Sequence, residues 1–278
     1  MKDDEIRKMV RASYANIAVQ DNSCCGPAKT CGCSSPRKAM SKAIGYTDEE
    51  LGAVPDGANL GLGCGNPTAL ASLEEGEVVL DLGAGAGFDC FLAANAVGKD
   101  GKIIGVDMTP EMLEKARENA RKGDYQNVEF RLGEIEHLPA ADNSVDVVIS
   151  NCVINLSPDK RRVFKEAFRV LKPGGRLMIS DMVLLKDLPD FVKNSVAAYV
   201  GCLAGALMRD EYIGTIEAAG FQQIGIVDET SFPIEWVTDD PTIKASMEAL
   251  QISPEEIKEF DGSVISIKIS GVKPKEIT

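Results

Sequence analysis

Hydrophobic positions in the middle of the chain alternate between short apolar runs and amphipathic stretches. The runs at 78–82, 102–107, 128–132, 145–150 and 176–180 predict buried strands. The segments 88–97, 110–121 and 157–171 between them predict helices, the last of them stopped by Pro173-Gly174-Gly175. This strand–helix alternation predicts an α/β fold with a doubly wound, mostly parallel sheet and helices on both faces.

The two ends of the chain have other patterns. Residues 3–18 carry apolar side chains at helical spacing, whereas 20–36 and 48–67 are rich in Gly and Pro and predict loops. Residues 187–220 predict mainly helix, followed by strands at 222–227 and 263–269. In the last strand, isoleucines alternate with Ser266 and Lys268, which predicts an antiparallel strand with one less buried face.

Composition narrows the class of protein. The chain has 278 residues, 44% hydrophobic and 26% charged, which are ordinary globular values. A net charge of −13 argues against binding to nucleic acid or to anionic membranes. The most apolar uncharged run, Asn194–Met208, is shorter than the roughly 18 residues of a membrane span. The N-terminus lacks the pattern of a signal peptide, so we expect a cytoplasmic protein.

A glycine-rich turn, Asp81–Gly87, directly follows the first predicted strand. Glycines let a ligand approach the backbone, and the next helix begins there. Asp107 ends the second strand, where a carboxylate can accept hydrogen bonds from ribose hydroxyls. The main alternative is a dinucleotide oxidoreductase. The Gly-x-Gly-x-Gly spacing and the preceding acid argue against it.

The chain contains eight cysteines but a single histidine, His137. In a cytosolic protein such cysteines are more often packed, metal-binding or redox-active than disulfide-bonded, and a lone histidine argues against a Ser-His-Asp triad. Cys152 follows the fourth strand, and Cys64 and Cys202 lie among glycines. Only the fold could bring these three thiols together. Thiolates are soft ligands, so a trivalent metalloid suits them.

The Asp81–Gly87 segment resembles the first motif of class I S-adenosylmethionine-dependent methyltransferases, which have a Rossmann-like seven-stranded sheet. The resemblance implies that Gly83, Gly85 and Gly87 line the methionine part of the cofactor and that Asp107 binds the ribose. It also implies that Met108 packs on the adenine and that Glu134 and Ile135 flank its amino group. We assign Asp81 and Asn151 to the same cofactor site.

Three further stretches, Gly61–Pro67, Ser150–Leu156 and Gly201–Ala206, resemble arsenite methyltransferases, and the resemblance covers about residues 1–220. It implies that Cys152 and Cys202 hold As(III) and that Cys64 is a third thiol, either a ligand or a disulfide partner during turnover. Arsenite or its thiol adducts would be the substrate, with thioredoxin or glutathione as reductant. A fourth cysteine would come from the set Cys24, Cys25, Cys31 and Cys33.

The same resemblance divides the chain into three parts. Residues 1–72 would form a helix and loops that cover the active site, with Tyr14 and the 61–63 loop over the cofactor. Residues 73–183 would bind S-adenosylmethionine, and 184–278 would bind arsenic and complete the sheet. Cys90 lies on an apolar helix face and is interpreted as packing.

Two alternatives remain open from the sequence. One is a carbon methyltransferase of the same fold that acts on a quinone or a lipid, for which cysteine replacement should not matter. The other is a protein that binds a metalloid or zinc without catalysis. It should produce no S-adenosylhomocysteine.

Overall fold

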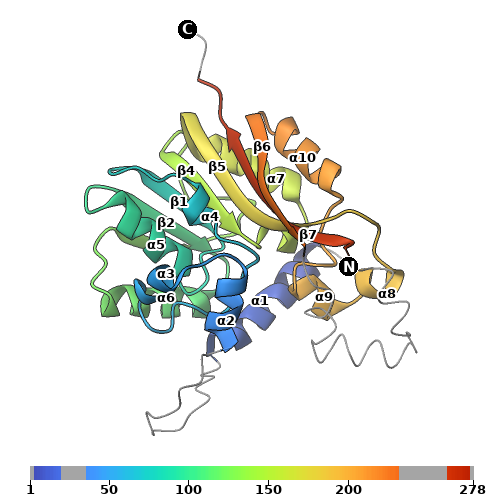
Figure 1. Ribbon diagram of the computed structural model, residues 1–278, viewed down its shortest axis with the longest axis horizontal. Coiled ribbons are helices and arrows are strands. Elements are labelled where there is room, and N and C mark those ends of the chain that lie inside the picture. The colour runs from blue at the N-terminus through green and yellow to red at the C-terminus, as the bar shows by residue number, and fades with distance from the viewer. Residues whose placement is uncertain (1–2, 20–35, 232–261, 276–278) are drawn as a thin grey trace, which may run out of the picture.

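The computed structural model describes residues 3–19, 36–231 and 262–275. A seven-stranded sheet forms its centre, in the order β3-β2-β1-β4-β5-β7-β6 (Figure 1). Strands β1 to β5 run parallel, and β7 pairs antiparallel with both β5 and β6. The predicted fold class is therefore confirmed. The strands are β1 Val78–Leu82, β2 Lys102–Asp107, β3 Val128–Leu132, β4 Val145–Asn151, β5 Leu171–Leu184, β6 Gln222–Ser231 and β7 Val264–Val272.

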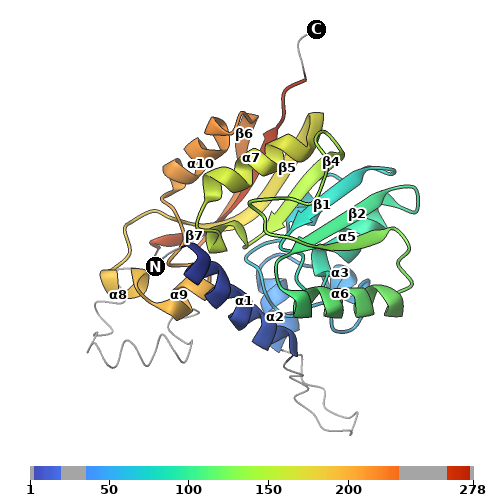
Figure 2. The ribbon, with the colours of Figure 1, turned by 180° about the vertical axis from the view of Figure 1, so that it is seen from behind.

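Helices cover both faces of the sheet (Figure 1, Figure 2). On one face, α5 (Phe88–Val97) and α6 (Pro110–Lys122) pack on β1, β2 and β4, through side chains that include Phe91 and Leu113. On the other, α7 (Lys160–Val170) and α10 (Arg209–Ala218) bury Phe164 and Tyr212 against the sheet. Because helices cover both faces of these buried strands, neither face is exposed to water. This explains why their sequences are almost entirely apolar.

A third apolar cluster lies at the carboxyl ends of the parallel strands. It joins α1 (Asp3–Val19), the loop around Cys64, the short helix η1 (Ile154–Leu156) and α9 (Val196–Val200). In Figure 1, α1, α2 (Pro36–Ala43) and α9 lie together beneath this edge of the sheet. The remaining short helices are α3 Asp48–Gly52, α4 Pro67–Leu70 and α8 Asp190–Lys193. The N-terminal helix, predicted from spacing alone, thus closes over the edge where open α/β sheets bind ligands.

Some local predictions were wrong. The strand predicted at 176–180 is longer in the structure, since α7 ends at Val170 and β5 runs from Leu171 to Leu184, with the Pro-Gly-Gly segment inside it. Proline disfavours the helical region for the residue before it, here Lys172, so the chain is already extended there. Residues 201–208 are not helical, although 187–220 was predicted mainly so. The last strand is antiparallel as predicted, and Lys268 lies on its less buried face, but Ser266 is only 4% exposed and its hydroxyl donates to the Cys64 carbonyl (2.6 Å).

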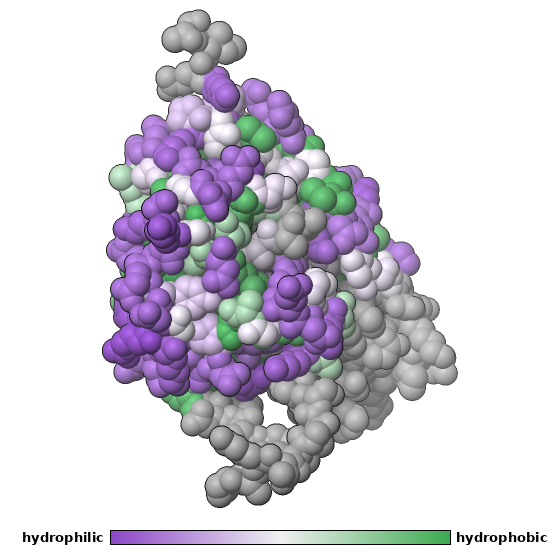
Figure 3. Space-filling model, turned by 60° about the vertical axis from the view of Figure 1, so that its left-hand side comes forward, coloured by the Kyte–Doolittle hydropathy of each residue, from purple (hydrophilic) through white to green (hydrophobic). Residues whose placement is uncertain are grey.

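Polar and charged side chains cover most of the face that Figure 3 shows. In Figure 3 the visible face is mainly hydrophilic, with small separate hydrophobic patches. Among the described helices, none is long and apolar enough to span a membrane.

Candidate active site

A cavity of about 620 Å³ opens between the glycine-rich turn and the cysteines. Cavities of this size hold small-molecule ligands. Its lining includes the turn after β1, Asp107 and Met108, residues of α1, and all three thiols singled out above. The order of the sheet reverses between β1 and β4, so the cavity lies at the topological switch point of the fold.

Backbone conformation and close packing explain the glycines of the turn. Gly83 and Gly85 have φ of 71° and 52°, a region that side chains with a Cβ rarely adopt. A Cβ on Gly83 would lie 2.4 Å from Val153, whereas one on Gly85 would meet nothing closer than 4.0 Å. The Gly85 backbone therefore faces open cavity, where a ligand can approach it. Gly87, the N-cap of α5, packs against Phe91 and Phe130.

Asp107 is fixed by two backbone N–H groups. Gly85 donates to one carboxylate oxygen (3.0 Å) and Thr109 to the other (2.8 Å). Burial raises the pKa of this carboxyl, although the backbone donors lower it. Each carboxylate oxygen has about two lone-pair sites, so each can accept a further bond from a ribose hydroxyl. Met108 and Ile135 also line the cavity, and their contact with adenine stays a prediction.

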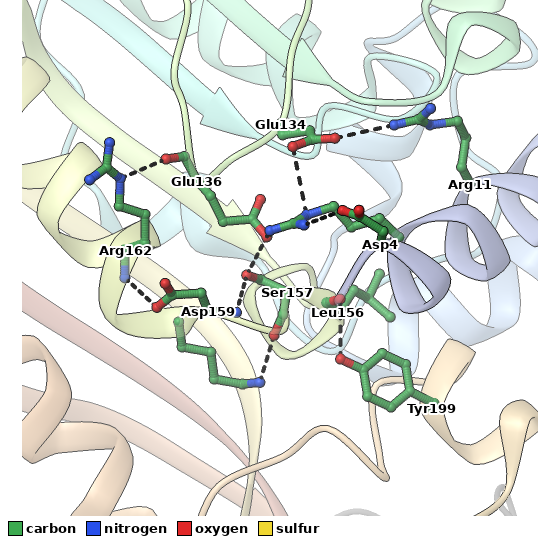
Figure 4. Close-up of polar contacts among 11 residues, drawn as sticks. Asp4, Arg11, Glu134, Glu136, Leu156, Ser157, Asp159, Arg162 and Tyr199 are labelled. Carbon is green, nitrogen blue, oxygen red and sulfur yellow. Dashed lines mark hydrogen bonds and ion pairs between the residues drawn. The ribbon is translucent and has the colours of Figure 1, made fainter. Parts of the chain in front are cut away.

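Glu134 has a different setting from the one predicted. Its carboxylate pairs with Arg11 (3.3 Å) and Arg7 (3.6 Å) of α1, and the cavity is lined instead by its neighbours Gly133, Ile135 and Glu136. Glu136 also binds Arg7 (3.2 Å). Figure 4 shows Glu134, its partner Arg11 and the neighbouring Glu136 in this group of polar contacts. These ion pairs hold α1 against the loop after β3. A role for Glu134 at the adenine amino group stays a prediction.

Two buried carboxylates lie at the inner end of the cavity. Asp81 and Asp89 are 3% and 8% exposed, and neither pairs with a lysine or arginine of the described part of the chain. Burial raises the pKa of Asp89 to about 6 and that of Asp81 well above its usual value. Tyr46 donates to Asp89 at 2.6 Å, and Cys90 donates to Asp81 at 3.2 Å. An acidic pair of this kind suits a cationic ligand, and S-adenosylmethionine carries both an ammonium and a sulfonium group.

Asn151 links the end of β4 to the loop that carries Cys64. Its amide oxygen accepts the Cys64 N–H (3.0 Å), and its amide nitrogen lies within hydrogen-bond distance of the Tyr46 hydroxyl, the Gly65 carbonyl and Asp89. Although Asn151 lines the cavity, these contacts are all internal. Its predicted contact with the cofactor is untested, whereas its contacts place Cys64.

The fold brings Cys64, Cys152 and Cys202 together. Cys64 and Cys202 are 4% and 3% exposed, and Cys152 is partly exposed. The Cys202 thiol donates to the Cys152 carbonyl (2.8 Å), and the Cys64 and Cys152 sulfurs lie within 4.8 Å of each other. The Cys152 thiol interacts with both of the other thiols. Those two contacts, followed by burial, raise the pKa of Cys152 well above its usual value. Cys152 thus interacts with both of the other thiols, and Cys64, Cys152 and Cys202 together are named the row of thiols.

Two of these cysteines have a strained, left-handed backbone. Cys152 and Cys202 have φ of 55° and 63°, in the left-handed region, which costs a residue with a Cβ roughly 1–2 kcal/mol. The pKa of Cys202 is lowered by its contact with Cys152, but burial and nearby negative groups leave it raised overall. Cys90 is fully buried in the core, as predicted from its helix face. Cys24, Cys25, Cys31 and Cys33 lie outside the described residues.

Sequence reasoning missed three residues of this region. Asp181, at the carboxyl half of β5, has a carboxylate oxygen within 4.8 Å of the Cys64 and Cys152 sulfurs. The sequence held a signal for Asp181, since it is an acid that follows a buried apolar run. It also held one for Asp89, an acid in the first turn of the apolar helix α5. Tyr46 carried no such signal. Tyr14, expected over the cofactor, lines the cavity and donates to the Val200 carbonyl (3.2 Å), next to the Cys202 loop.

Comparison with known proteins agrees with this geometry. Residues 73–220 match the family model described as a methyltransferase domain. The fold, the glycine turn and Asp107 define a class I methyltransferase. An arsenic(III) S-adenosylmethionine methyltransferase from Chlamydomonas reinhardtii has a crystal structure that matches with a TM-score of 0.61 at 34% identity, over 87% of this chain and 75% of that one. The chain belongs to the arsenite methyltransferase family.

Two sequence relatives have the same description. The arsenite methyltransferase of Halobacterium salinarum is 52% identical over 246 residues, which are 85% of this chain and 63% of that protein. The human arsenite methyltransferase is 35% identical over 231 residues, or 80% of this chain and 59% of that protein. The chain therefore spans less than two thirds of either relative's length.

Proposed function

We propose that this chain transfers methyl groups from S-adenosylmethionine to trivalent arsenic held by Cys64, Cys152 and Cys202, a reaction that serves arsenic detoxification. The observation that supports this most is the row of three thiols inside the same cavity as the glycine turn and Asp107. Three sulfurs satisfy the three bonds of As(III) and leave its lone pair free. Arsenite is neutral at pH 7, so the acidic surface does not repel it.

Substrate binding exchanges oxygen for sulfur. Each thiol forms an As–S bond as one As–O bond breaks, and the thiol proton leaves with the hydroxide as water. Because the pKa values of Cys152 and Cys202 are raised, this coupled proton loss avoids free thiolates in the apolar cluster. The bound arsenic then presents its lone pair toward the cavity.

The chain contributes mainly position to the methyl transfer. When bound, S-adenosylmethionine supplies a methyl group on a positively charged sulfur, and loss of that methyl leaves a neutral thioether. Asp81, Asp89 and Asp107 would hold the cofactor at one end of the cavity while the cysteines hold arsenic at the other. Reactive groups placed about 3 Å apart gain most of their rate from this arrangement. No general base is needed, since the lone pair carries no proton.

Methylation leaves arsenic formally pentavalent, so each cycle needs two electrons. Two cysteine sulfurs can supply them by leaving arsenic together as a disulfide. The methylated arsenic returns to the trivalent state, still bound to the third cysteine, and takes up hydroxide from water, which releases one proton. A dithiol such as reduced thioredoxin, or glutathione, would then reduce that disulfide by thiol–disulfide exchange. This chemistry requires a reducing compartment, which is why we place it in the cytoplasm.

Replacement of the thiols tests this proposal. We expect C152S and C202S to lose arsenite-dependent formation of S-adenosylhomocysteine, measured with a thiol reductant present. Both variants should still bind S-adenosylhomocysteine in calorimetric titrations. C90S is the matched control, because it alters a buried thiol outside the row and keeps a donor to Asp81. Full activity in C152S or C202S would rule out the thiol site. It would favour a carbon methyltransferase with a quinone or lipid acceptor.

A further inference from the structure

Beside the row of thiols lies a compact group with a different ligand set. The Cys64 sulfur, the Cys152 sulfur and a carboxylate oxygen of Asp181 all lie within 4.8 Å of one another. Asp181 and Cys64 are buried, and Cys152 lines the cavity. The three residues come from adjacent parts of the fold, since Cys152 N–H donates to the carbonyl of Ser180 (2.8 Å) on β5. Cys202 is not a member of this group.

The Asp181 carboxylate is held in place by three donors. One oxygen accepts from the Asn155 amide (2.8 Å) and the Met182 N–H (2.9 Å), and the other accepts from the Tyr212 hydroxyl (2.9 Å). Asn155 and Tyr212 are themselves fully buried. Outer contacts of this kind orient a metal-binding carboxylate and are part of many metal sites. No described lysine or arginine forms a salt bridge with Asp181 at 4.0 Å or less.

The two ligand sets suit different elements. Arsenic(III) is thiophilic and is satisfied by three sulfurs, so it has no need of a carboxylate. Zinc binds cysteine sulfur at about 2.3 Å and carboxylate oxygen at about 2.0–2.2 Å, and it accepts mixed sets with an open fourth position. Small side-chain shifts would bring the three ligand atoms to these distances. The fourth position would face the cavity, where Cys152 is partly exposed.

We propose that Cys64, Cys152 and Asp181 form a site for a thiophilic divalent cation, with Zn²⁺ as the representative ion, bound by two sulfurs and one carboxylate. Its competition with trivalent arsenic rests on the proposed function, because the two ions would share Cys64 and Cys152. The third ligand differs: Asp181 for the divalent cation and Cys202 for arsenic. Zinc would therefore be an inhibitor that occupies the substrate site.

The test measures binding of each ion to a reciprocal pair of variants. All proteins are full-length, reduced, and carry Ser in place of Cys24, Cys25, Cys31 and Cys33, so that these thiols take up no metal. Zn²⁺ affinity is measured by competition with a colorimetric chelator, and arsenite binding by equilibrium dialysis. D181N should weaken Zn²⁺ binding by about 100-fold, because loss of a direct ligand should cost at least as much as loss of an outer contact to a ligand. It should leave arsenite binding unchanged. C202S should weaken arsenite binding and leave Zn²⁺ binding unchanged.

Unchanged Zn²⁺ affinity in D181N would overturn the proposal. Should D181N fail to fold, X-ray absorption of the zinc-loaded protein decides without mutation. A first shell of two sulfurs plus oxygen supports the site, and three sulfurs refute it. The outcomes also separate the two proposals. If Zn²⁺ binding depends on Asp181 while no variant or parent binds arsenite, the divalent site stands and the arsenic function fails.

Discussion

Replacement of Asn151 by alanine tests how the Cys64 loop is held. The side chain connects the end of β4 to this loop through the Cys64 N–H and the Gly65 carbonyl, and to Tyr46 and Asp89 behind it. Truncation removes all these contacts at once. The bond from Ser266 to the Cys64 carbonyl remains, so the loop keeps one attachment.

The size of the effect follows from the number of hydrogens available. The amide nitrogen has two hydrogens for three acceptors, so N151A removes about three hydrogen bonds. At about 0.5–1.5 kcal/mol each, the loss is about 3 kcal/mol. If this loss falls on the loop, its open form becomes about 100-fold more populated. Arsenite would then lose its third sulfur for part of the time.

Two measurements check this expectation. Urea unfolding should show a stability loss of no more than about 3 kcal/mol, and arsenite affinity should fall toward that of C64S. Asn95→Ala is the control, because it removes a single exposed hydrogen bond to the Ala53 carbonyl. If N151A binds arsenite as tightly as the parent, the loop is positioned by other contacts and the reasoning fails.

Three other changes have defined outcomes. In D89N the Asp89 carboxyl, whose pKa is raised to about 6, is replaced by an amide that does not titrate. The folded parent binds the Asp89 proton more tightly than the unfolded parent does. Relative to D89N, the parent should therefore lose up to about 3 kcal/mol of stability as pH rises from about 4 to 6, measured by denaturant unfolding without cofactor. G205A places a Cβ 2.2 Å from the Asn155 carbonyl and should cost about 1–3 kcal/mol in thermal denaturation and weaken arsenite binding. R7A leaves Glu136 without its cation and should weaken binding of S-adenosylhomocysteine about tenfold in calorimetry.

Matched variants sharpen these expectations. Gly214→Ala lies in α10 with nothing within 4 Å of the new Cβ, so it should stabilise rather than destabilise. Lys8→Ala removes an exposed charge next to Arg7 and should not affect cofactor binding. If the difference in unfolding free energy between parent and D89N did not change with pH, Asp89 would not be a buried carboxyl with a raised pKa.

Strands β1 to β4 could be predicted to within about a residue, whereas β5 is much longer than the predicted 176–180. The runs before Gly83 and after Gly101 are apolar because both faces of those strands are covered, and that composition is visible without a structure. Residues 201–208 were mispredicted for an equally physical reason. A left-handed Cys202 and a Gly205 pressed against the Asn155 carbonyl depend on distant parts of the chain.

The site was predicted unevenly for the same reason. Glycines and an acid at a strand end have local signatures, Cys64 and Cys202 stood out by their glycine neighbours, and Cys152 stood out by its place after a predicted strand. Tyr46 and Asp181 act through partners 43 and 31 residues away along the chain, Asp89 and Tyr212. Glu134 was placed by analogy, but its charge is engaged by a helix more than a hundred residues earlier. Pairings at such separations leave no local trace in a single sequence.

The left-handed backbone at Cys152 and Cys202 sets activity against thermal robustness. Glycine at either position would relieve roughly 1 kcal/mol of conformational strain while it deletes a sulfur. At Cys152, whose side chain is partly exposed, a selection for heat resistance alone should therefore enrich Cys→Gly, and under the proposed function the survivors would lose arsenite methylation. Laboratory evolution of this chain toward higher temperature then needs a simultaneous screen for arsenic chemistry, or it will discard a thiol that the proposed function requires.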